Sequence, residues 1–283
     1  MRASLIQIDV NPDESINSRR RRVGSLVRGQ RGSDLVVLPE LWTVGAFAYE
    51  LFADEAETLR GPSPSAPSAT SSSSVVSAPS SATVSATAQA MSEAARDAGV
   101  WLHAGSIPER GADGALYNTS LVFSPDGALA HTYRKIHRFG FDKGEAVLMG
   151  AGDRLVTVPL PELTLGLSTC YDLRFPELFR GLVDAGAQAL VVSAGWPERR
   201  RAHWSLLARA RAVENQAYVL ACGTAGTHAG VEQAGHSVVV DPWGEVVAEA
   251  GRSEEILTVD LDPSKVTETR EVFPALKDRV LGR

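Results

Sequence analysis

The chain has 283 residues, of which 44% are hydrophobic and 22% charged, a composition typical of a globular protein with an ample core. Its formal net charge of −6 argues against general nucleic-acid binding, because phosphate binding needs a basic face. No apolar run approaches the ~20 residues of a membrane-spanning helix, and the first ten residues resemble a strand more than a signal peptide. The two cysteines, Cys170 and Cys222, are too few for a disulfide framework, so we expect a reduced, cytoplasmic setting without membrane partners.

Segments typical of strands and of helices alternate along the chain. A first strand is expected at residues 3–10, a polar helix at 12–28 and a short, fully apolar strand at 34–39. Further strands are expected at 100–106, 116–123, 129–133, 163–169, 187–194, 217–222, 236–240, 245–248 and 256–259, and further helices at 86–98, 175–185 and 201–216. Turn sequences at 125–127 and 241–244 predict hairpins. Hairpins combined with crossover helices indicate an α/β fold, in which helices cover mixed sheets.

Residues 62–87 depart from this alternation. These 26 residues include eleven Ser, five Ala and four Pro, and they carry no charge. Because such a segment cannot bury enough apolar surface to offset its ordering entropy, we expect a flexible surface insertion within one domain spanning residues 1–283. A tether that binds partners is the alternative.

Two basic clusters, Arg19 to Arg22 and Arg199 to Arg201, stand out in the otherwise acidic chain. Each is interleaved with or followed by sequence compatible with a helix. We therefore expect solvated helix faces in preference to phosphate-binding patches.

Cys170 stands at the end of the apolar strand predicted at 163–169, just before a polar turn and a helix beginning near Pro176. A side chain at such an elbow projects from the end of a sheet. Its thiol is reachable, and the next amide, that of Tyr171, can face a developing oxyanion. Taken alone, a cysteine here would more often be a buried structural residue.

Two charged residues follow other predicted strands. Glu40 lies at the carboxyl edge of the strand at 34–39, where ligands usually bind in open α/β sheets. Lys135 follows the strand at 129–133; facing the same cleft, it would lower the thiol pKa and later hold an oxyanion. Acyl transfer through a thioester needs such a base and such a cation. Taken alone, Glu40 could equally be a surface charge at the start of a loop, and Lys135 would more often be a solvated charge at a sheet edge.

Three segments in this order, Leu38-Pro39-Glu40, Tyr133-Arg134-Lys135-Ile136-His137 and Cys170-Tyr171-Asp172-Leu173-Arg174-Phe175-Pro176, resemble the catalytic signatures of the nitrilase superfamily, the carbon–nitrogen hydrolases. The resemblance covers nearly the whole chain and includes residues 194–197, 209–216 and 235–244. The branch it most resembles is that of the Nit-type amidases, similar to omega-amidases that hydrolyse the side-chain amide of 2-oxo dicarboxylic acids.

The resemblance implies an α-β-β-α sandwich that dimerises through a helical face, and an enzyme that uses no metal or organic cofactor. It implies Glu40 as base, Lys135 as oxyanion donor and Cys170 as nucleophile. It also matches Glu145 to an additional glutamate that orients the lysine and the substrate. The expected reaction is hydrolysis of a small carboxylated amide through a cysteine thioester, with release of ammonia.

Two residues are candidates for substrate binding. Arg174 could pair with a substrate carboxylate, because a guanidinium matches that geometry bidentately. It could instead form a structural ion pair with Asp172, Glu177 or Glu214. Trp196 follows an apolar strand and resembles a pocket wall, with core packing as the alternative.

Three other functions remain open. A nitrilase or an N-carbamoyl amidohydrolase would share the thioester chemistry. A papain-like hydrolase would use His137 or His203 as its base, although the flanking signatures of that family are absent. A catalytically silent scaffold could use the Ser-rich insertion. The histidines show no metal-ligand spacing.

Overall fold

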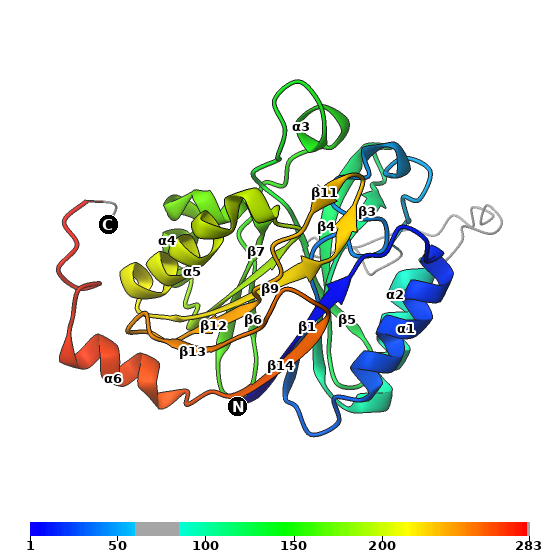
Figure 1. Ribbon diagram of the computed structural model, residues 1–283. Helices are drawn as coiled ribbons and strands as arrows, with labels where there is room; N and C mark the ends of the chain where they lie inside the picture. The colour runs from blue at the N-terminus through cyan, green and yellow to red at the C-terminus, as the bar shows by residue number, and fades with distance from the viewer. Residues whose placement is uncertain (60–84, 282–283) are drawn as a thin grey trace, which may run out of the picture.

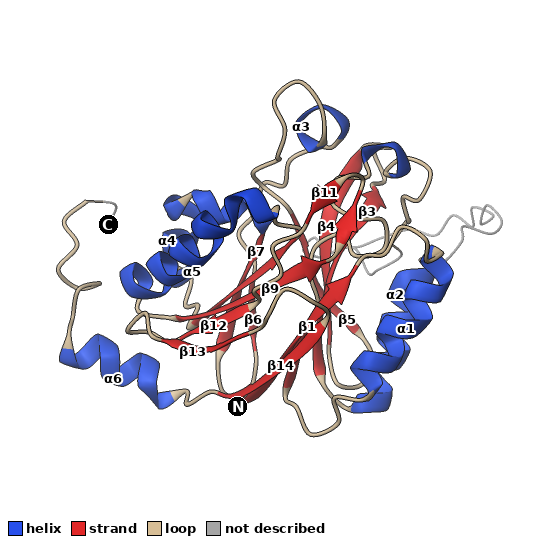
Figure 2. Ribbon diagram, in the orientation of Figure 1, coloured by secondary structure: helices blue, strands red, loops and turns tan. Residues whose placement is uncertain are grey.

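In the computed structural model, which describes residues 1–59 and 85–281, twelve strands form one hydrogen-bonded ladder that divides into two facing sheets (Figures 1 and 2). The first sheet contains β1 (Arg2–Asp9), β2 (Leu35–Val37), β3 (Trp101–Arg110), β4 (Leu116–Phe123), β5 (Leu129–Arg134) and β14 (Glu255–Asp260). The second contains β6 (Thr157–Pro159), β7 (Thr164–Thr169), β8 (Ala189–Ala194), β9 (Tyr218–Ala225), β12 (Val238–Val240) and β13 (Val246–Glu249). A separate ribbon pairs β10 (Thr227–His228) with β11 (Val231–Glu232).

Both sheets mix parallel and antiparallel pairs. Strands β1, β2 and β3 are parallel neighbours, as are β7, β8 and β9, while β3–β4–β5 and β12–β13 run antiparallel. The two sheets join where β1 and β9 pair, at Ile8 with Thr224 and Asp9 with Ala225. The predicted mixed sheets and both predicted hairpins are therefore confirmed.

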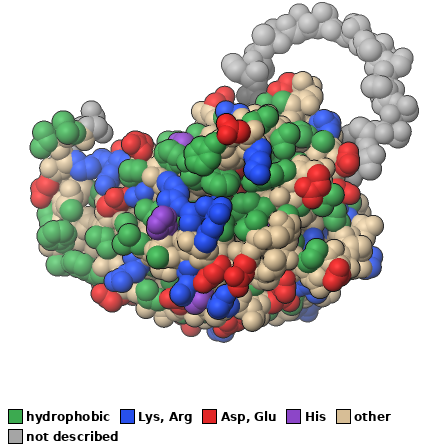
Figure 3. Space-filling model, turned by 45° about the horizontal axis from the view of Figure 1, so that its top comes forward, with side chains coloured by type: hydrophobic (Ala, Val, Ile, Leu, Met, Phe, Trp, Pro, Cys, Tyr) green, Lys and Arg blue, Asp and Glu red, His purple; other side chains and the backbone are tan. Residues whose placement is uncertain are grey.

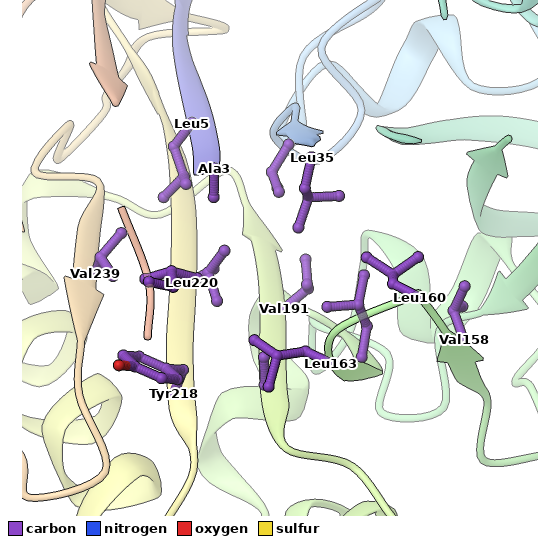
Figure 4. Close-up of a cluster of buried hydrophobic side chains, with 14 of the residues drawn as sticks. Ala3, Leu5, Leu35, Val158, Leu160, Leu163, Val191, Tyr218, Leu220 and Val239 are labelled. Atoms are coloured by element: carbon purple, nitrogen blue, oxygen red, sulfur yellow. The ribbon is translucent and has the colours of Figure 1, made fainter. Parts of the chain in front are cut away.

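The space between the sheets is filled by apolar side chains (Figure 4). Leu5 and Leu35 project from the first sheet, and Val191, Leu220 and Val239 from the second; all five are fully buried. Burying a side chain of this size contributes about 1.5–3 kcal/mol. This layer holds the two sheets, and hence the strand ends that carry the site, in a fixed relation.

Helices cover the outer faces of both sheets (Figure 1). Those on the first sheet are α1 (Ile16–Arg28) and α2 (Ala86–Ala98), and those on the second are α4 (Pro176–Asp184) and α5 (Arg201–Asn215). The remaining helices are α3 (Glu145–Leu148), α6 (Ser264–Val272) and the 3-10 turns η1 (Tyr49–Leu51), η2 (Cys170–Arg174) and η3 (Glu198–Arg200). The layers are those of the predicted α-β-β-α sandwich. Of the helices in the described ranges, none has the length and apolarity to cross a membrane.

Most of the predicted Ser-rich insertion, residues 62–84, lies outside the described residues. Ser85 is the N-cap of α2, and Thr87 lies in the first turn of that helix. The Ser85 hydroxyl caps the helix by accepting the Ala88 N–H at 3.0 Å, a role for which serine is favoured. Glu57 accepts the Thr87 N–H at 2.9 Å, which fixes the start of the helix against the loop that precedes the insertion.

Candidate active site

Glu40 is placed by the chain as it leaves β2. The Leu38 N–H continues the ladder to β3, and the chain then turns sharply at Leu41, which has a φ of +44°. This turn packs tightly on β3: a Cβ on Gly105 would lie 1.9 Å from the carbonyl oxygen of Pro39, so only glycine fits there. Glu40 lies in this turn, three residues past the end of β2, and its side chain is only 1% exposed.

Lys135 follows β5 and points into the same buried space. Its Nζ donates to Glu40 Oε1 at 2.7 Å and to Glu145 Oε2 at 2.6 Å. An ammonium group has three N–H donors, and these two bonds use two of them. The third N–H is therefore available to a bound molecule.

Glu145 is the first residue of the short helix α3, where a Gly-flanked loop was expected. Its Oε2 accepts the backbone N–H of Phe139 at 2.9 Å as well as the bond from Lys135. Its other oxygen, Oε1, accepts from Asn118 Nδ2 at 2.6 Å. With these three donors around it, Glu145 is held rigidly against the lysine.

Asn118 was not identified from the sequence. It lies within β4, is 3% exposed, and donates from Nδ2 to both carboxylates, at 2.8 Å to Glu40 Oε1 and 2.6 Å to Glu145 Oε1. The Asn118 amide thus bridges the carboxylates of Glu40 and Glu145, as the Lys135 ammonium also does. An asparagine inside a strand has no distinctive pattern, so only a preference for polar residues on this face could have indicated it.

Cys170 directly follows β7 as the first residue of η2 and has a φ of +49°. This left-handed conformation is strained for a residue other than glycine, and it turns the side chain out of the sheet. The buried carboxylate of Asp172 supports the turn by accepting the Thr169 N–H at 2.9 Å and the Tyr133 hydroxyl at 2.7 Å. The strand-to-helix elbow expected from the sequence is therefore present, as a 3-10 turn.

Gly195 connects Cys170 with Glu40. The Cys170 sulfur lies 3.7 Å from the Gly195 carbonyl oxygen, and the Gly195 N–H donates to Glu40 Oε2 at 2.8 Å. A Cβ at this position would lie 2.4 Å from that of Ala46, so a larger residue would push the loop after Glu40 away. The thiol and the carboxylate consequently approach the backbone of the same residue, the thiol at its C=O and the carboxylate at its N–H.

Burial determines the protonation of this cluster. Burial, and next the negative charge of Glu40, raise the pKa of the Cys170 thiol well above its usual value, so the resting sulfur is protonated. Burial also raises the pKa of Glu145, with Lys135 opposing the shift. Burial disfavours the charge on Lys135, but the carboxylates of Glu145 and Glu40 outweigh it and raise the pKa of the ammonium. The site thus combines a neutral thiol with a fixed positive charge.

A family model described as carbon-nitrogen hydrolase matches residues 2–271. The chain belongs to the carbon-nitrogen hydrolase family. It is a hydrolase acting on carbon–nitrogen bonds other than peptide bonds, as the sequence predicted.

Named relatives of this hydrolase match along nearly its whole length. It is 39% identical over 281 residues to the 2-oxoglutaramate amidase of Paenarthrobacter nicotinovorans, a match covering 97% of this chain and 87% of the relative. It is 38% identical over 288 residues to the omega-amidase NIT2 of Mus musculus, covering 98% and 94%. Among solved structures, Nit3 of Saccharomyces cerevisiae has a TM-score of 0.81 at 31% identity, covering 99% of this chain and 96% of that one. XC1258 of Xanthomonas campestris has a TM-score of 0.83 at 30% identity, covering 100% and 99%.

Two of the predicted substrate-binding residues, Tyr171 and Arg174, lie with Cys170 in η2, and the third, Trp196, packs against Arg174. Tyr171 follows Cys170 in the first turn of η2, where backbone N–H groups have no acceptor within the helix. Arg174 forms none of the three predicted ion pairs: its Nη2 lies 3.1 Å from His203 Nδ1, and its guanidinium carbon 5.1 Å from the centre of a Trp196 ring. Trp196 is buried in the core beneath Arg174, and its role as a pocket wall stays a prediction.

The histidines proposed for a papain-like hydrolase are occupied elsewhere. His137 bonds through Nδ1 to Asp172 at 2.8 Å, and its ring stacks on Phe175. His203 bonds to Arg174. In residues 1–59 and 85–281, no group of three or more His, Cys, Asp or Glu side chains is arranged to hold a metal ion.

Proposed function

We propose that this hydrolase is an omega-amidase-like enzyme, which cleaves the amide of a small carboxylated molecule through a thioester on Cys170. The observation that carries the proposal is the buried contact of Cys170 and Glu40 with the backbone C=O and N–H of one residue, Gly195, beside the charged Lys135. A base, a nucleophile and a cation are the three groups that acyl transfer requires.

In the first step, Glu40 takes the proton of the Cys170 thiol while the sulfur attacks the amide carbon. Glu40 Oε2 suits this role because Gly195 fills only one of its acceptor positions, whereas Oε1 already accepts from Lys135 and Asn118. The C–S bond forms and the carbonyl π electrons move to oxygen. Because the thiol rests protonated, a base positioned next to it is necessary for attack.

The oxyanion that results needs donors already in place. We propose that the third N–H of Lys135 and the backbone N–H of Tyr171 supply them. Glu145 keeps the ammonium charged and oriented through its 2.6 Å bond. The protonated Glu40 then gives its proton to the amide nitrogen, the C–N bond breaks, and ammonia leaves.

Hydrolysis of the thioester repeats these steps with water. Glu40 removes a proton from the water as its oxygen attacks the thioester carbon, and the same two donors hold the second oxyanion. The C–S bond then breaks, and the sulfur recovers a proton from Glu40. The carboxylic acid product leaves, and the enzyme returns to its starting protonation state.

The proposed substrate class is supported by the activities of the two relatives, a 2-oxoglutaramate amidase and an omega-amidase, together with basic side chains near the thiol. Arg174, at the end of η2, would bind the substrate carboxylate. Trp196 would take part indirectly, because its ring lies under the Arg174 guanidinium.

The decisive experiment measures ammonia release from 2-oxoglutaramate, 2-oxosuccinamate, simple aliphatic amides, nitriles and N-carbamoyl compounds. We expect the 2-oxo acid amides to be preferred, with Cys170→Ala and Glu40→Gln inactive. Cys222→Ala is the matched control, since Cys222 is a fully buried cysteine in the core between the sheets. Turnover in Cys170→Ala would overturn the mechanism, and a preference for nitriles or carbamoyl compounds would overturn the substrate class.

We further propose a cytoplasmic homodimer that forms through a helical face. In support, α5 exposes Leu206 and Val213, which are 67% and 54% accessible, and α6 exposes Val272, which is 76% accessible. Light scattering coupled to gel filtration tests this. A monomer at micromolar concentration would contradict it.

A further inference from the structure

Three consecutive arginines precede and begin α5, and they differ in environment. Arg199 is exposed, and Arg201 lies 3.4 Å from the carboxylate of Glu198. Arg200 is half-buried, with its guanidinium carbon 5.2 Å from the centre of the Phe139 ring. The solvated face predicted for this cluster is therefore wrong for Arg200, which turns toward the site.

Phe139 separates Arg200 from the catalytic cluster. The backbone N–H of Phe139 donates to Glu145 Oε2 at 2.9 Å, and its ring lies 5.4 Å from the ring of Tyr171. On its other side, Arg200 is anchored through its carbonyl oxygen, which accepts from Trp196 Nε1 at 2.8 Å. Arg200 thus lies one aromatic ring away from the catalytic residues while remaining partly open to solvent.

Positive charge gathers here without an acidic partner. Among the described residues, neither Arg200 nor Arg174 has a carboxylate oxygen within 4.0 Å, whereas the nearby Glu198 and Glu214 pair with other arginines. Burial, and next the positive charges of Arg199 and Arg174, lower the pKa of Arg200. Figure 3 shows basic side chains gathered in the middle of this face, next to a histidine and below a hydrophobic area. Neighbouring guanidinium groups without a carboxylate partner repel one another, and a bound anion would relieve this repulsion.

We infer that Arg200 is the main binding group for the substrate carboxylate, at the end of the substrate opposite the amide, with Arg174 as its second contact. The inference rests on the proposed function and identifies the residue that selects the substrate. Arg174 already has one N–H directed at His203, whereas no hydrogen bond from the Arg200 guanidinium is found within the described ranges. A free guanidinium can bind a carboxylate through two parallel N–H donors.

The position of Arg200 also defines the chemical class of the substrate. The Phe139 ring, which lies beside both the Arg200 guanidinium and the ring of Tyr171, offers an apolar surface for a short methylene chain. The substrate is therefore a short linear amide with a carboxylate at its far end. Neutral aliphatic amides lack the group that Arg200 binds, and cationic amides would be repelled.

The test compares Arg200→Gln with the matched control Arg199→Gln, the exposed neighbour. With 2-oxoglutaramate, we expect kcat/KM of Arg200→Gln to fall about 100-fold, mainly through KM, because a charge-assisted contact is lost. With pentanamide, which has no carboxylate, kcat/KM should change less than about twofold, since the loss depends on the charged group. Arg200→Lys should recover part of the loss, and Arg199→Gln should match the parent on both amides.

A second measurement does not depend on turnover. Calorimetric titration of 2-oxoglutaramate into Cys170→Ala, with and without Arg200→Gln, should show a similar, about 100-fold weakening of binding. Equal losses on both amides, or unchanged binding in the double variant, would overturn the role of Arg200. A parent enzyme that releases no ammonia from 2-oxo acid amides would instead overturn the proposed function, so the two failures are distinguishable.

Discussion

Replacing Asn118 tests whether the two glutamates act as one positioned unit. Asn118→Leu keeps the side-chain volume but removes the N–H donors that bridge Glu40 and Glu145 at 2.8 and 2.6 Å. A hydrogen bond to a charged group contributes about 1.5–3 kcal/mol, and it favours the ionised form of the carboxylate that accepts it. Loss of the bond therefore favours the protonated, inactive form of the cluster.

The size of the effect follows from the same energy. Since one pH unit corresponds to 1.36 kcal/mol, the acid limb of the pH profile should move upward by about 1–2 units. The limb moves upward because the lost hydrogen bond stabilised an ionised carboxylate, and without it a higher pH is needed to ionise that carboxyl group. Asn118→Asp, which adds a third carboxyl group to the cluster, should move the limb in the same direction and further.

The assay is kcat/KM for ammonia release from pH 4 to 9. Thr119→Val is the control, because Thr119 is the next residue in β4, is equally buried, and bonds to Glu109 outside the cluster. A purely structural role for Asn118 would lower activity evenly at every pH. An unmoved acid limb in Asn118→Leu would refute the reasoning.

The remaining predictions concern protonation and stability. The absorbance of the parent at 240 nm, minus that of Cys170→Ala, should show no thiolate below about pH 9, because burial and Glu40 raise the thiol pKa; a thiolate at pH 7 would contradict a base-activated thiol. His103 and His228 are buried, and burial lowers the pKa of each to about 4, below the ~6.5 of the unfolded chain. The stabilisation from these neutral histidines should therefore be fully present above about pH 6.5. As the pH falls to 4, each histidine should lower the free energy of unfolding by about 3 kcal/mol. Urea unfolding at pH 7 and at pH 4.5 measures the difference, and equal free energies of unfolding would contradict the prediction. Asp172→Asn should lower the free energy of unfolding by about 3 kcal/mol, because a buried acceptor of four hydrogen bonds is lost, whereas Asp184→Asn, at a partly exposed pair with Arg279, should lower it by less than about 1 kcal/mol.

The clustering of Glu40, Lys135 and Cys170 could be predicted because each follows a strand that the sequence indicates. Strand ends are visible in a sequence, and the first sheet brings the ends of β2 and β5 together even though Glu40 and Lys135 are 95 positions apart in the chain. Glu145 lies in a helix of four residues, too short to produce a periodic pattern, so only the family resemblance indicated it.

Asn118 and Arg200 could not be found in this way. An asparagine within β4 is an ordinary residue in an alternating strand, and its importance comes from two acids distant in sequence. Arg200 has the same local sequence context as Arg199. Only the folded structure distinguishes them, because the Arg200 guanidinium packs on the ring of Phe139, which comes from a loop about 60 residues earlier. Helix α6 was also not predicted, because only Val266 and Thr269 are buried in it and it lacks an apolar stripe.

The pairing of β1 has a consequence for how the protein is made. This strand is synthesised before the other described strands, yet its antiparallel partner is β14, with Arg2 opposite Asp260, and the Met1 amino group bonds to the carbonyl of Leu261 at 3.0 Å. One edge of β1 must therefore remain open until β14, about 250 residues later, has been synthesised. A nascent chain arrested before β14 would expose a hydrophobic strand edge, the kind of surface that recruits chaperones or pairs with another copy.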